Sequence, residues 1–282
     1  MAADAQLDAL RRNLAAAGSV AVAFSGGVDS TFLLAVAHEV LGDRAVAVTA
    51  RSATFPEREL DEARQFCRAR AIRHEILEYD ELAIDGFAAN PPNRCYFCKK
   101  NLFTRMLAFA RANGLAQVVE GSNADDDGDY RPGRRAIREL GIASPLRDAG
   151  LTKDDVRRLS RARGLPTWRK PSFACLASRF PYGETITAAG LKRVADAEQH
   201  LLTHVPGLAQ VRVRSHGDVA RIEVPPADFD AVAAQRAEIA AALRRMGFAY
   251  VALDLAGYRT GSLNETLPPD VRAAATGKDG AK

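Results

Sequence analysis

The first half of the chain alternates strand patterns with helix patterns, and this alternation restricts the fold more than any other feature. Short, mostly apolar runs predict strands at 19–24, 44–50, 72–79 and 117–122. Amphipathic patterns predict helices between or before them, at 4–17, 30–41, 56–71 and 99–113. Strands that alternate with helices pair in parallel through right-handed crossovers. The sequence therefore predicts an α/β domain built on a mostly parallel sheet.

The pattern changes after about residue 165. Prolines and glycines interrupt 167–187 and predict a long loop there. The remaining chain predicts a smaller α+β domain, with helices at 187–203 and 226–246 and strands at 209–216, 219–224 and 248–255. Gly217-Asp218 is a hairpin signal between the first two of these strands. We expect a first domain at 1–166, a cysteine-containing loop at 167–186, a second domain at 187–265 and a disordered tail at 266–282.

The junction between the first strand and its helix carries the sequence SGGVDS, residues 25–30. A glycine-rich turn between a parallel strand and a helix points backbone N–H groups at one spot, where the helix dipole is positive. Gly26 and Gly27 let an anion approach closely, and the hydroxyls of Ser25 and Ser30 add donors. A simple helix cap explains two glycines, but the whole hexapeptide after a buried strand favours a phosphate site.

Two features of this hexapeptide refine the prediction. Its Asp29 is suited to hold Mg²⁺ beside bound phosphates. It has neither the lysine of a Walker loop nor the spacing of a dinucleotide-binding G-x-G-x-x-G motif. The pattern therefore predicts a phosphate site of another kind.

The four cysteines divide into two groups. Cys67 shares a helical stripe with Leu60 and Ala63, so we expect it to be buried and inert. Cys95 and Cys98 form a C-x-x-C pair that opens a helix, and Cys175 lies in the long loop. Since there is no second C-x-x-C pair, a closed zinc site with four thiolates is disfavoured. Three thiolates suit a [4Fe–4S] cluster with one open iron, although ordinary thiols remain an alternative.

The amino-acid composition excludes few classes of function. The chain is 47% apolar and 26% charged, with a net charge of +4, which fits anionic small molecules as well as nucleic acid. No apolar stretch approaches the length of a membrane span, and the N-terminus carries too many charges for a signal peptide. We therefore expect a cytoplasmic protein without a membrane partner.

The hexapeptide at 25–30 resembles the PP-loop of the ATP pyrophosphatases. The resemblance implies a Rossmann-like fold of the adenine nucleotide alpha hydrolase type. It also implies that ATP is cleaved to pyrophosphate and that AMP stays on the substrate. The segment EGSNADD, at 120–126, resembles the second nucleotide-contacting segment of that superfamily, which suggests that Gly121 and Asn123 contact ATP. A solvated turn is the alternative for this segment.

Longer motifs resemble the LarE family, the ATP-dependent sulfur transferases that build the nickel-pincer nucleotide cofactor. They are RCYFCKK, EGSNADDDGDYRPGRRA, KPSFACLASRFPYGETIT, VRVRSHGDVARIEV and DLAGYRTGSLNE, in this order along nearly the whole chain. The resemblance implies a pyridinium mononucleotide substrate with two carboxylates. Each carboxylate is adenylated by ATP, and a sulfur nucleophile then displaces AMP to give a thiocarboxylate. Members of the family are often homo-oligomers.

The resemblance implies one of two sulfur sources. Some members sacrifice the cysteine that matches Cys175, which becomes dehydroalanine. Others hold a [4Fe–4S] cluster on three cysteines and pass on a sulfide from the open iron. Because this chain has Cys95 and Cys98 in addition to Cys175, it resembles the members that carry a cluster. Lys170 and Arg179 flank Cys175 and would favour its thiolate.

Arg212 and Arg214 alternate with valines, which on a strand places both guanidinium groups on one face. Spacing alone favours the solvent-exposed face of a half-buried strand. The resemblance instead implies that this pair holds the phosphate of the substrate together with Ser178 and Arg179. Glu198 is a further candidate at the same site.

Three rival functions remain open from the sequence. A tRNA thiolase can share the PP-loop and the cysteine trio, but it needs a broad basic surface, and no added basic arm is evident. We therefore expect no nucleic-acid partner. An amide-forming ligase would use ammonia and would not need Cys175. A nucleotide sensor would bind ATP without chemistry.

Overall fold

The computed structural model describes residues 2–128 and 132–268, which form two compact units. The first unit contains the chain up to Tyr79 together with Cys95–Phe173. The second contains Asp80–Arg94 and the described residues from Ala174 onward. The two units are described separately below.

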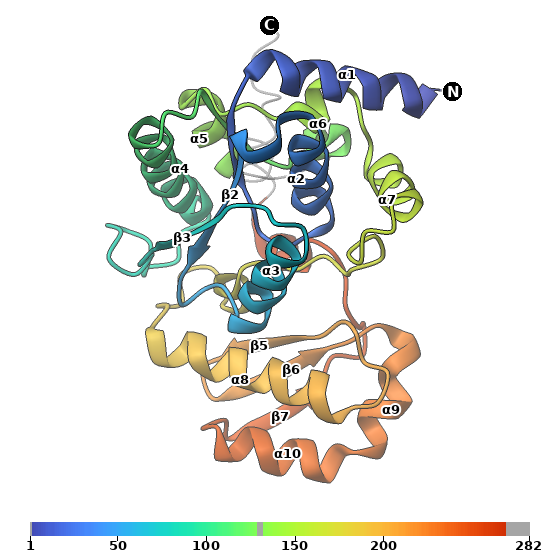
Figure 1. Ribbon diagram of the computed structural model, residues 1–282. Helices are drawn as coiled ribbons and strands as arrows, with labels where there is room; N and C mark the ends of the chain where they lie inside the picture. The colour runs from blue at the N-terminus through green and yellow to red at the C-terminus, as the bar shows by residue number, and fades with distance from the viewer. Residues whose placement is uncertain (1, 129–131, 269–282) are drawn as a thin grey trace, which may run out of the picture. The chain divides into compact units, whose positions relative to one another are not determined.

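The first unit is built on a parallel sheet of four strands (Figure 1). The strands are β1 (Val20–Ala23), β2 (Ala45–Arg51), β3 (His74–Glu78) and β4 (Gln117–Val119), in the spatial order β3-β2-β1-β4. Val20 of β1 pairs with Ala45 on one side and with Gln117 on the other, and all three pairings are parallel. The predicted α/β class with a parallel sheet is confirmed.

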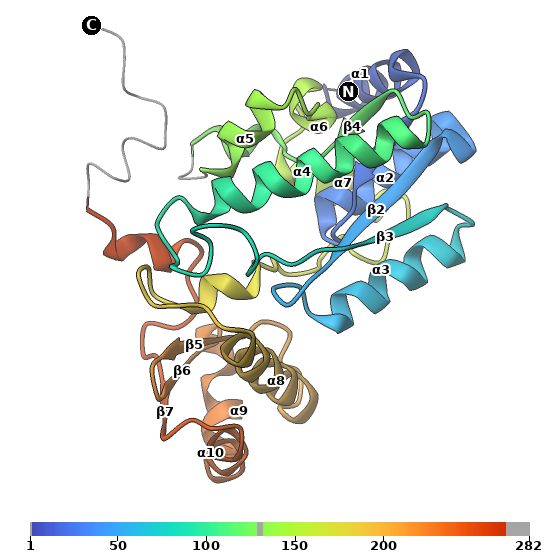
Figure 2. The same ribbon diagram turned by 90° about the vertical axis from the view of Figure 1, so that its left-hand side faces the viewer.

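Helices cover both faces of this sheet. One face packs against α1 (Ala2–Ala17), α2 (Val28–Leu41), α3 (Glu57–Ala69) and α7 (Lys153–Ala162). The other face packs against α4 (Arg94–Ala112) and α5 (Gly133–Glu139). Figure 2 shows α3 and α4 on opposite sides of β2 and β3. Because both faces are covered, β1 is apolar along its length, and Val20, Ala21 and Val22 are completely buried.

The stretch between β4 and the end of this unit is more helical than the sequence prediction, which assigned no helix there. Besides α5 and α7 this stretch contains the 3-10 helix η2 (Ala124–Gly128) and the short helix α6 (Pro145–Asp148). Elsewhere in this unit, the 3-10 helix η1 (Gly42–Arg44) follows α2. A capping box starts α7: Asp155 N–H donates to the Thr152 hydroxyl at 3.2 Å, and Thr152 N–H donates to the Asp155 carboxylate at 3.3 Å. This cap fixes where Lys153, the first residue of α7, stands.

The second unit has the predicted α+β character. Its strands are β5 (Arg212–His216), β6 (Val219–Glu223) and β7 (Tyr250–Leu253), in the order β5-β6-β7. The predicted hairpin is present, because β5 and β6 pair antiparallel across Gly217-Asp218, whereas β6 and β7 are parallel. The helices are α8 (Ala188–His204), α9 (Phe229–Ala234) and α10 (Arg236–Arg245), with 3-10 helices η3 (Leu176–Arg179), η4 (Pro226–Asp228) and η5 (Ser262–Thr266).

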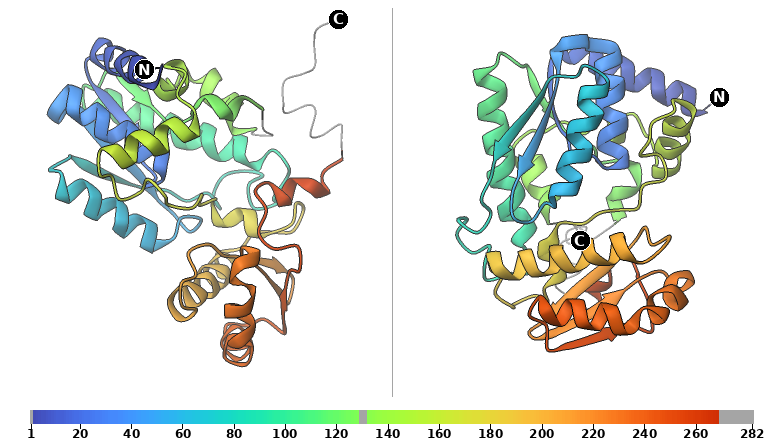
Figure 3. Two further views of the ribbon diagram at one scale, coloured as in Figure 1. Left: turned by 90° about the vertical axis from the view of Figure 1, so that its right-hand side faces the viewer. Right: turned by 60° about the horizontal axis from the view of Figure 1, so that its bottom comes forward.

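Helices α8 and α10 pack beside each other against the sheet of the second unit (Figure 3). The predicted helix at 226–246 is broken in the structure. Gln235, with φ −101° and ψ 17°, leaves helical geometry and separates α9 from α10.

Residues 80–94 belong to the second unit, although they lie between two elements of the first in the sequence. They hold the chain before α8 through backbone hydrogen bonds, from Gly183 N–H to the Asn90 carbonyl at 3.0 Å and from Ile186 N–H to the Ala88 carbonyl at 2.8 Å. The side chain of Asn90 donates to the Pro181 carbonyl at 2.6 Å. The predicted boundaries at 166, 186 and 265 stay predictions, and the predicted tail lies outside the described residues from 269 on. None of the helices in the described ranges is long and apolar enough to cross a membrane.

Candidate functional site

The two segments predicted to contact a nucleotide follow neighbouring strands. Residues 25–30 follow β1, residues 120–126 follow β4, and β1 pairs directly with β4. The chain order reverses between these two strands, and ligands of open α/β sheets bind at the carboxyl ends of strands at such a point. A Cβ on Gly121 would lie 3.0 Å from Ser30 N, so the two segments are in close contact. The fold therefore brings the predicted nucleotide residues together.

The PP-loop segment folds back on itself at the start of α2. Ser25 N–H donates to the Ser30 hydroxyl at 3.3 Å, and the two serine hydroxyls are hydrogen-bonded at 3.1 Å. Gly26 has φ +68°, a left-handed conformation that glycine adopts without strain. Gly27 is the N-cap of α2, and no side chain makes a capping hydrogen bond at this helix end. The N–H groups of the first turn and the positive end of the dipole therefore lie at this loop.

Asp29 is held by two residues from distant parts of the chain. Asn123 Nδ2 donates to Asp29 Oδ1 at 3.2 Å, and Lys153 Nζ forms an ion pair with Asp29 Oδ2. Lys153 also donates its backbone N–H to the Asp125 carboxylate at 2.8 Å. Lys153 was not predicted as a site residue, because it is 124 residues from Asp29, although the capping-box residues Thr152 and Asp155 on either side of it mark the start of its helix.

Lys170 is a second lysine beside the loop. Its Nζ donates to the Gly26 carbonyl at 3.3 Å and forms ion pairs with Glu59 at 2.7 Å and Glu62 at 2.5 Å, both on α3. Its side chain is only 16% exposed. Two carboxylates therefore balance the charge of Lys170, and its bond to Gly26 holds the loop backbone. These contacts do not support the prediction that Lys170 favours the thiolate of Cys175.

The C-x-x-C pair lies in the first turn of α4, as predicted for a pair that opens a helix. Cys95 is exposed and Cys98 is half-buried. The Tyr79 hydroxyl donates to the Cys98 carbonyl at 2.7 Å and contacts Cys98 Sγ at 3.8 Å. Cys67 is buried as predicted, and burial raises the pKa of its thiol to about 12. In the described residues of either unit, no three His, Cys, Asp or Glu side chains are grouped so as to hold a metal ion.

Cys175, the predicted nucleophile, is an exposed residue of the second unit and the N-cap of η3. Beneath it lies a buried arginine cluster, which we define as Arg179, Arg212 and Arg214 with the carboxylates of Glu198 and Glu223. Each of these five residues has a relative exposed area of 6% or less. Spacing alone predicts that Arg212 and Arg214 lie on a solvent-exposed face of their strand. This prediction is wrong, because both are buried.

Arg179 and Glu198 form the most enclosed pair of the cluster. Arg179 Nε and Nη2 donate to the two carboxylate oxygens of Glu198 at 2.6 Å and 2.9 Å. Val213 N–H on β5 donates to the same carboxylate at 2.9 Å. Burial alone would raise the pKa of Glu198, but attraction to Arg179 and Arg212 and these hydrogen bonds outweigh it, so the pKa lies below its usual value.

Arg214 and Arg212 complete the cluster. Arg214 donates to Glu223 and to the Ser178 carbonyl, both at 2.7 Å. Its Nε is buried and has no hydrogen-bond partner among the described residues. Burial, followed by repulsion from Arg179, lowers the pKa of Arg212 to about 10. Three guanidinium groups face two carboxylates here, so the cluster has a surplus of positive charge that suits an anion.

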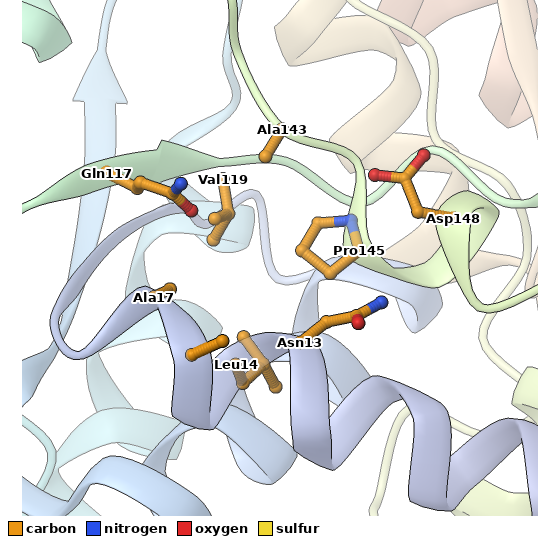
Figure 4. A pocket seen from close by; sticks show the side chains of 9 residues that line it. Asn13, Leu14, Ala17, Gln117, Val119, Ala143, Pro145 and Asp148 are labelled. Atoms are coloured by element: carbon orange, nitrogen blue, oxygen red, sulfur yellow. The ribbon is translucent and has the colours of Figure 1, made fainter.

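A separate hollow of about 300 Å³ lies between α1 and the edge of the sheet at β4 (Figure 4). Asn13 and Leu14 of α1 face Val119 and Pro145 across it. None of the residues that line it is a predicted site residue. It is therefore not part of the candidate site.

The chain is similar in sequence to several known proteins. The family model described as asparagine synthase matches residues 2–88. An uncharacterised protein of Synechocystis, slr1717, is 43% identical over 94% of this chain and 98% of its own. The pyridinium-3,5-bisthiocarboxylic acid mononucleotide synthase of Lactiplantibacillus plantarum is 40% identical over 88% of this chain and 90% of its own. The tRNA-specific 2-thiouridylase MnmA of Rickettsia felis is 27% identical over 67% of this chain and 61% of its own.

Proposed function

The chain belongs to the LarE family of enzymes, the pyridinium-3,5-bisthiocarboxylic acid mononucleotide synthases, and on that premise we propose that it converts the carboxylates of a pyridinium mononucleotide into thiocarboxylates at the expense of ATP. One observation supports this most directly. An exposed cysteine and an anion-binding cluster share one loop, because Arg214 donates to the carbonyl of Ser178, three residues after Cys175. A thiol and a phosphate site in one place suit sulfur transfer to a mononucleotide.

In the first step the PP-loop holds ATP. Backbone N–H groups at the start of α2 and the hydroxyls of Ser25 and Ser30 bind the β- and γ-phosphates, and Gly26 and Gly27 leave room for them. The segment with Gly121 and Asn123 lies against Ser30 of the PP-loop, where it would contact the nucleotide. Asp29 is the carboxylate of the loop that would hold Mg²⁺, in exchange for its contact with Asn123 or Lys153. We add Lys153 to this site, because its ammonium group reaches Asp29 and supplies the charge that a Walker lysine supplies elsewhere.

The chemistry follows from the poor reactivity of a carboxylate. A carboxylate oxygen of the substrate attacks the α-phosphorus of ATP, the bond to the β-phosphate breaks, and pyrophosphate leaves. The sulfur nucleophile then attacks the acyl carbon, and the bond from that carbon to the AMP oxygen breaks. When the nucleophile is hydrosulfide, AMP leaves and the product is a thiocarboxylate. When the nucleophile is the Cys175 thiolate, AMP leaves and a thioester forms; the α-proton of Cys175 is then removed and its Cβ–Sγ bond breaks, which gives the thiocarboxylate and dehydroalanine. Two such cycles modify both carboxylates, and the second route consumes one protein molecule in each cycle. The sulfur must be held near the acyl carbon for this exchange to be fast.

The substrate phosphate binds at the buried arginine cluster. Ser178, Arg212 and Arg214 are the proposed contacts, and Arg179 and Glu198 lie in the same hydrogen-bond network. The unpartnered Nε of Arg214 offers a donor to such a phosphate. Burial, followed by repulsion from Arg179, lowers the pKa of Arg212, and a bound phosphate would offset this repulsion.

The sulfur comes from a sulfide on a [4Fe–4S] cluster or from Cys175 itself. Three thiols are accessible to a cluster, because Cys95 and Cys175 are exposed and Cys98 is half-buried, whereas Cys67 is buried; among the described residues the three do not form a ready-made group of metal ligands. The residues that would hold it are Cys95, Cys98 and Cys175, and when bound it would supply an open iron for a hydrosulfide. We further propose a cytoplasmic homo-oligomer that has no nucleic-acid partner.

The decisive experiment supplies Mg-ATP and pyridinium-3,5-biscarboxylic acid mononucleotide under anaerobic conditions. We expect pyrophosphate release and a thiocarboxylate product, detected by mass spectrometry. Cys175→Ala should abolish the product, whereas an amide-forming ligase would keep its activity. Release of orthophosphate alone would contradict the proposal. Transfer of sulfur to tRNA instead of the mononucleotide would favour the tRNA thiolase.

The sulfur source can be decided on the same preparation. Iron and sulfide are assayed after anaerobic purification, and the intact mass of the protein is measured before and after turnover. Iron with an unchanged polypeptide mass supports the cluster. Loss of the mass of hydrogen sulfide at Cys175, without iron, supports sacrifice of the cysteine.

A further inference from the structure

We infer that Arg179 is a positioning residue, which holds the backbone of the loop that carries Cys175 and does not contact the substrate. The inference rests on the proposed function for the role of Cys175. It departs from the substrate-contact role that the family resemblance implies for Arg179. The loop in question is 174–178.

One side of the Arg179 guanidinium faces this loop. Its Nη1 donates to the Ala174 carbonyl at 3.0 Å and to the Ser178 hydroxyl at 2.8 Å, and lies 3.4 Å from the Cys175 carbonyl. The residue as a whole has no exposed surface. The guanidinium therefore serves as the hydrogen-bond partner of the Ala174 carbonyl, which lies just before the 3-10 helix η3.

The other side of the guanidinium is fixed by a carboxylate. Both oxygens of Glu198 accept from Arg179, in the two-pronged geometry that makes such pairs strong. Glu198 is itself bound by the N–H of Val213 on β5. The loop is thus connected through Arg179 and Glu198 to helix α8 and to the sheet of the second unit.

This arrangement determines which way the loop faces. The carbonyls of Ala174 and Cys175 point inward at the guanidinium, while the Cys175 residue is exposed. Ser178 N–H donates to the Cys175 carbonyl at 2.9 Å, which closes the turn. A sulfur donor must stay within contact distance of the acyl carbon, so a fixed loop is a catalytic requirement. Lysine cannot replace the arginine, because one ammonium group cannot serve the loop and both Glu198 oxygens in this planar geometry.

The neighbouring arginines differ in this respect. Arg214 leaves its Nε without a hydrogen-bond partner among the described residues, and burial, followed by repulsion from Arg179, lowers the pKa of Arg212. Arg179 instead donates through all three of its nitrogens to groups of the protein. We therefore assign substrate binding to Arg212 and Arg214, and the positioning of the loop to Arg179.

The test uses the full chain with the double substitution Arg179→Met and Glu198→Leu. Changing both partners avoids an unpaired buried charge, which would otherwise unfold the second unit. Hydrogen exchange is followed by mass spectrometry in peptides that cover 172–180 and, as an internal control, in peptides that cover β5 and β6. We expect exchange in the loop peptide to become about tenfold faster or more, because charged hydrogen bonds to its backbone are lost. The control peptides should exchange as in the wild type.

A binding measurement distinguishes positioning from substrate contact. Nicotinate mononucleotide serves as the probe, since it carries a pyridinium ring, a carboxylate and a phosphate, and calorimetry gives its affinity. We expect Arg212→Met to bind it about tenfold more weakly than the wild type, and the double variant to lose clearly less affinity than Arg212→Met. In turnover, Arg179→Lys should lower kcat and leave KM for the mononucleotide unchanged.

Two results would overturn the inference. One is loop exchange in the double variant that equals the wild type. The other is a loss of probe affinity in Arg179→Lys as large as in Arg212→Met. Should the double variant not fold, Arg179→Lys decides the question by the same two measurements. Hydrogen exchange requires no sulfur transfer, so failure of the proposed function is recognised separately, by wild-type protein that yields no thiocarboxylate.

Discussion

The PP-loop of the first unit and the buried arginine cluster of the second both suit phosphate, but they are built in opposite ways. The loop is one continuous hexapeptide that presents backbone donors and short hydroxyls, with Asp29 still 21% exposed. The cluster draws its charged side chains from η3, α8, β5 and β6, and the side chains of Arg179 and Glu198 are 0% and 1% exposed. A loop of this kind suits an anion through the backbone N–H groups that it presents. The cluster is stable only if its buried charged groups are paired with groups of opposite charge.

This difference separates the expected effects of substitution. In the cluster, a change that removes one partner leaves an uncompensated charge in the protein interior, so folding and function are lost together. At the PP-loop, a change alters how closely a ligand can approach while the sheet beneath it stays intact.

The largest effect is expected for Glu198→Ala. It leaves Arg179 buried without its carboxylate, which costs about 3–5 kcal/mol in the free energy of unfolding. Urea denaturation measures this loss. Asp196→Ala on the same helix is the matched control, because the Lys192–Asp196 pair is exposed and its loss should shift the midpoint little. Equal shifts of the urea midpoint in the two variants would mean that the buried Arg179–Glu198 pair contributes no more to stability than an exposed pair.

Next in size is Gly121→Ala. A Cβ here would lie 3.0 Å from the backbone nitrogen of Ser30, so the PP-loop must shift, at a cost of about 1–3 kcal/mol. We expect weaker binding of a non-hydrolysable ATP analogue in calorimetry. The control is Gly141→Ala, where φ is +64° but the space is open, so stability should fall while nucleotide affinity is kept. Unchanged affinity in Gly121→Ala would show that the two segments do not share a ligand.

A smaller effect is expected for Lys153→Met. If Lys153 contacts the outer phosphates, the variant should bind ATP about tenfold more weakly and AMP as well as the wild type does. Lys153→Arg, which keeps the charge, should restore most of the affinity. An equal loss for ATP and AMP would mean that Lys153 only supports the loop through Asp29.

The smallest effect concerns pH. The pKa of Glu198 in the folded protein lies below its usual value, because Arg179 outweighs the cost of burial. Its ionisation therefore stabilises the fold above the usual carboxyl pKa, and this contribution is lost as the pH falls through the lowered value. Urea midpoints of the wild type should fall on acidification more steeply than those of the Arg179→Met, Glu198→Leu double variant. If the urea midpoints of the two proteins fell equally with pH, the ionisation of Glu198 would not contribute to the stability of the fold.

Much of the first unit could be predicted from local pattern. The strands β1 to β4 alternate with helices, and the hexapeptide after β1 marks the turn between β1 and α2. The C-x-x-C pair was correctly placed at the start of a helix, and Cys67 was correctly predicted to be buried. These features depend on residues that are near each other in the sequence, which is why spacing reveals them.

Other features were decided by tertiary structure alone. Alternation put Arg212 and Arg214 on one face of a strand but could not show that the face is buried. The contact of Lys153 with Asp29 joins residues 124 apart, and that of Lys170 with Gly26 joins residues 144 apart. The partners of Arg179 likewise come from a loop and a helix whose packing no periodicity encodes. Sequence spacing reports which residues share an element and a face, but burial and charge pairing depend on which elements meet, and that is settled only when the chain folds.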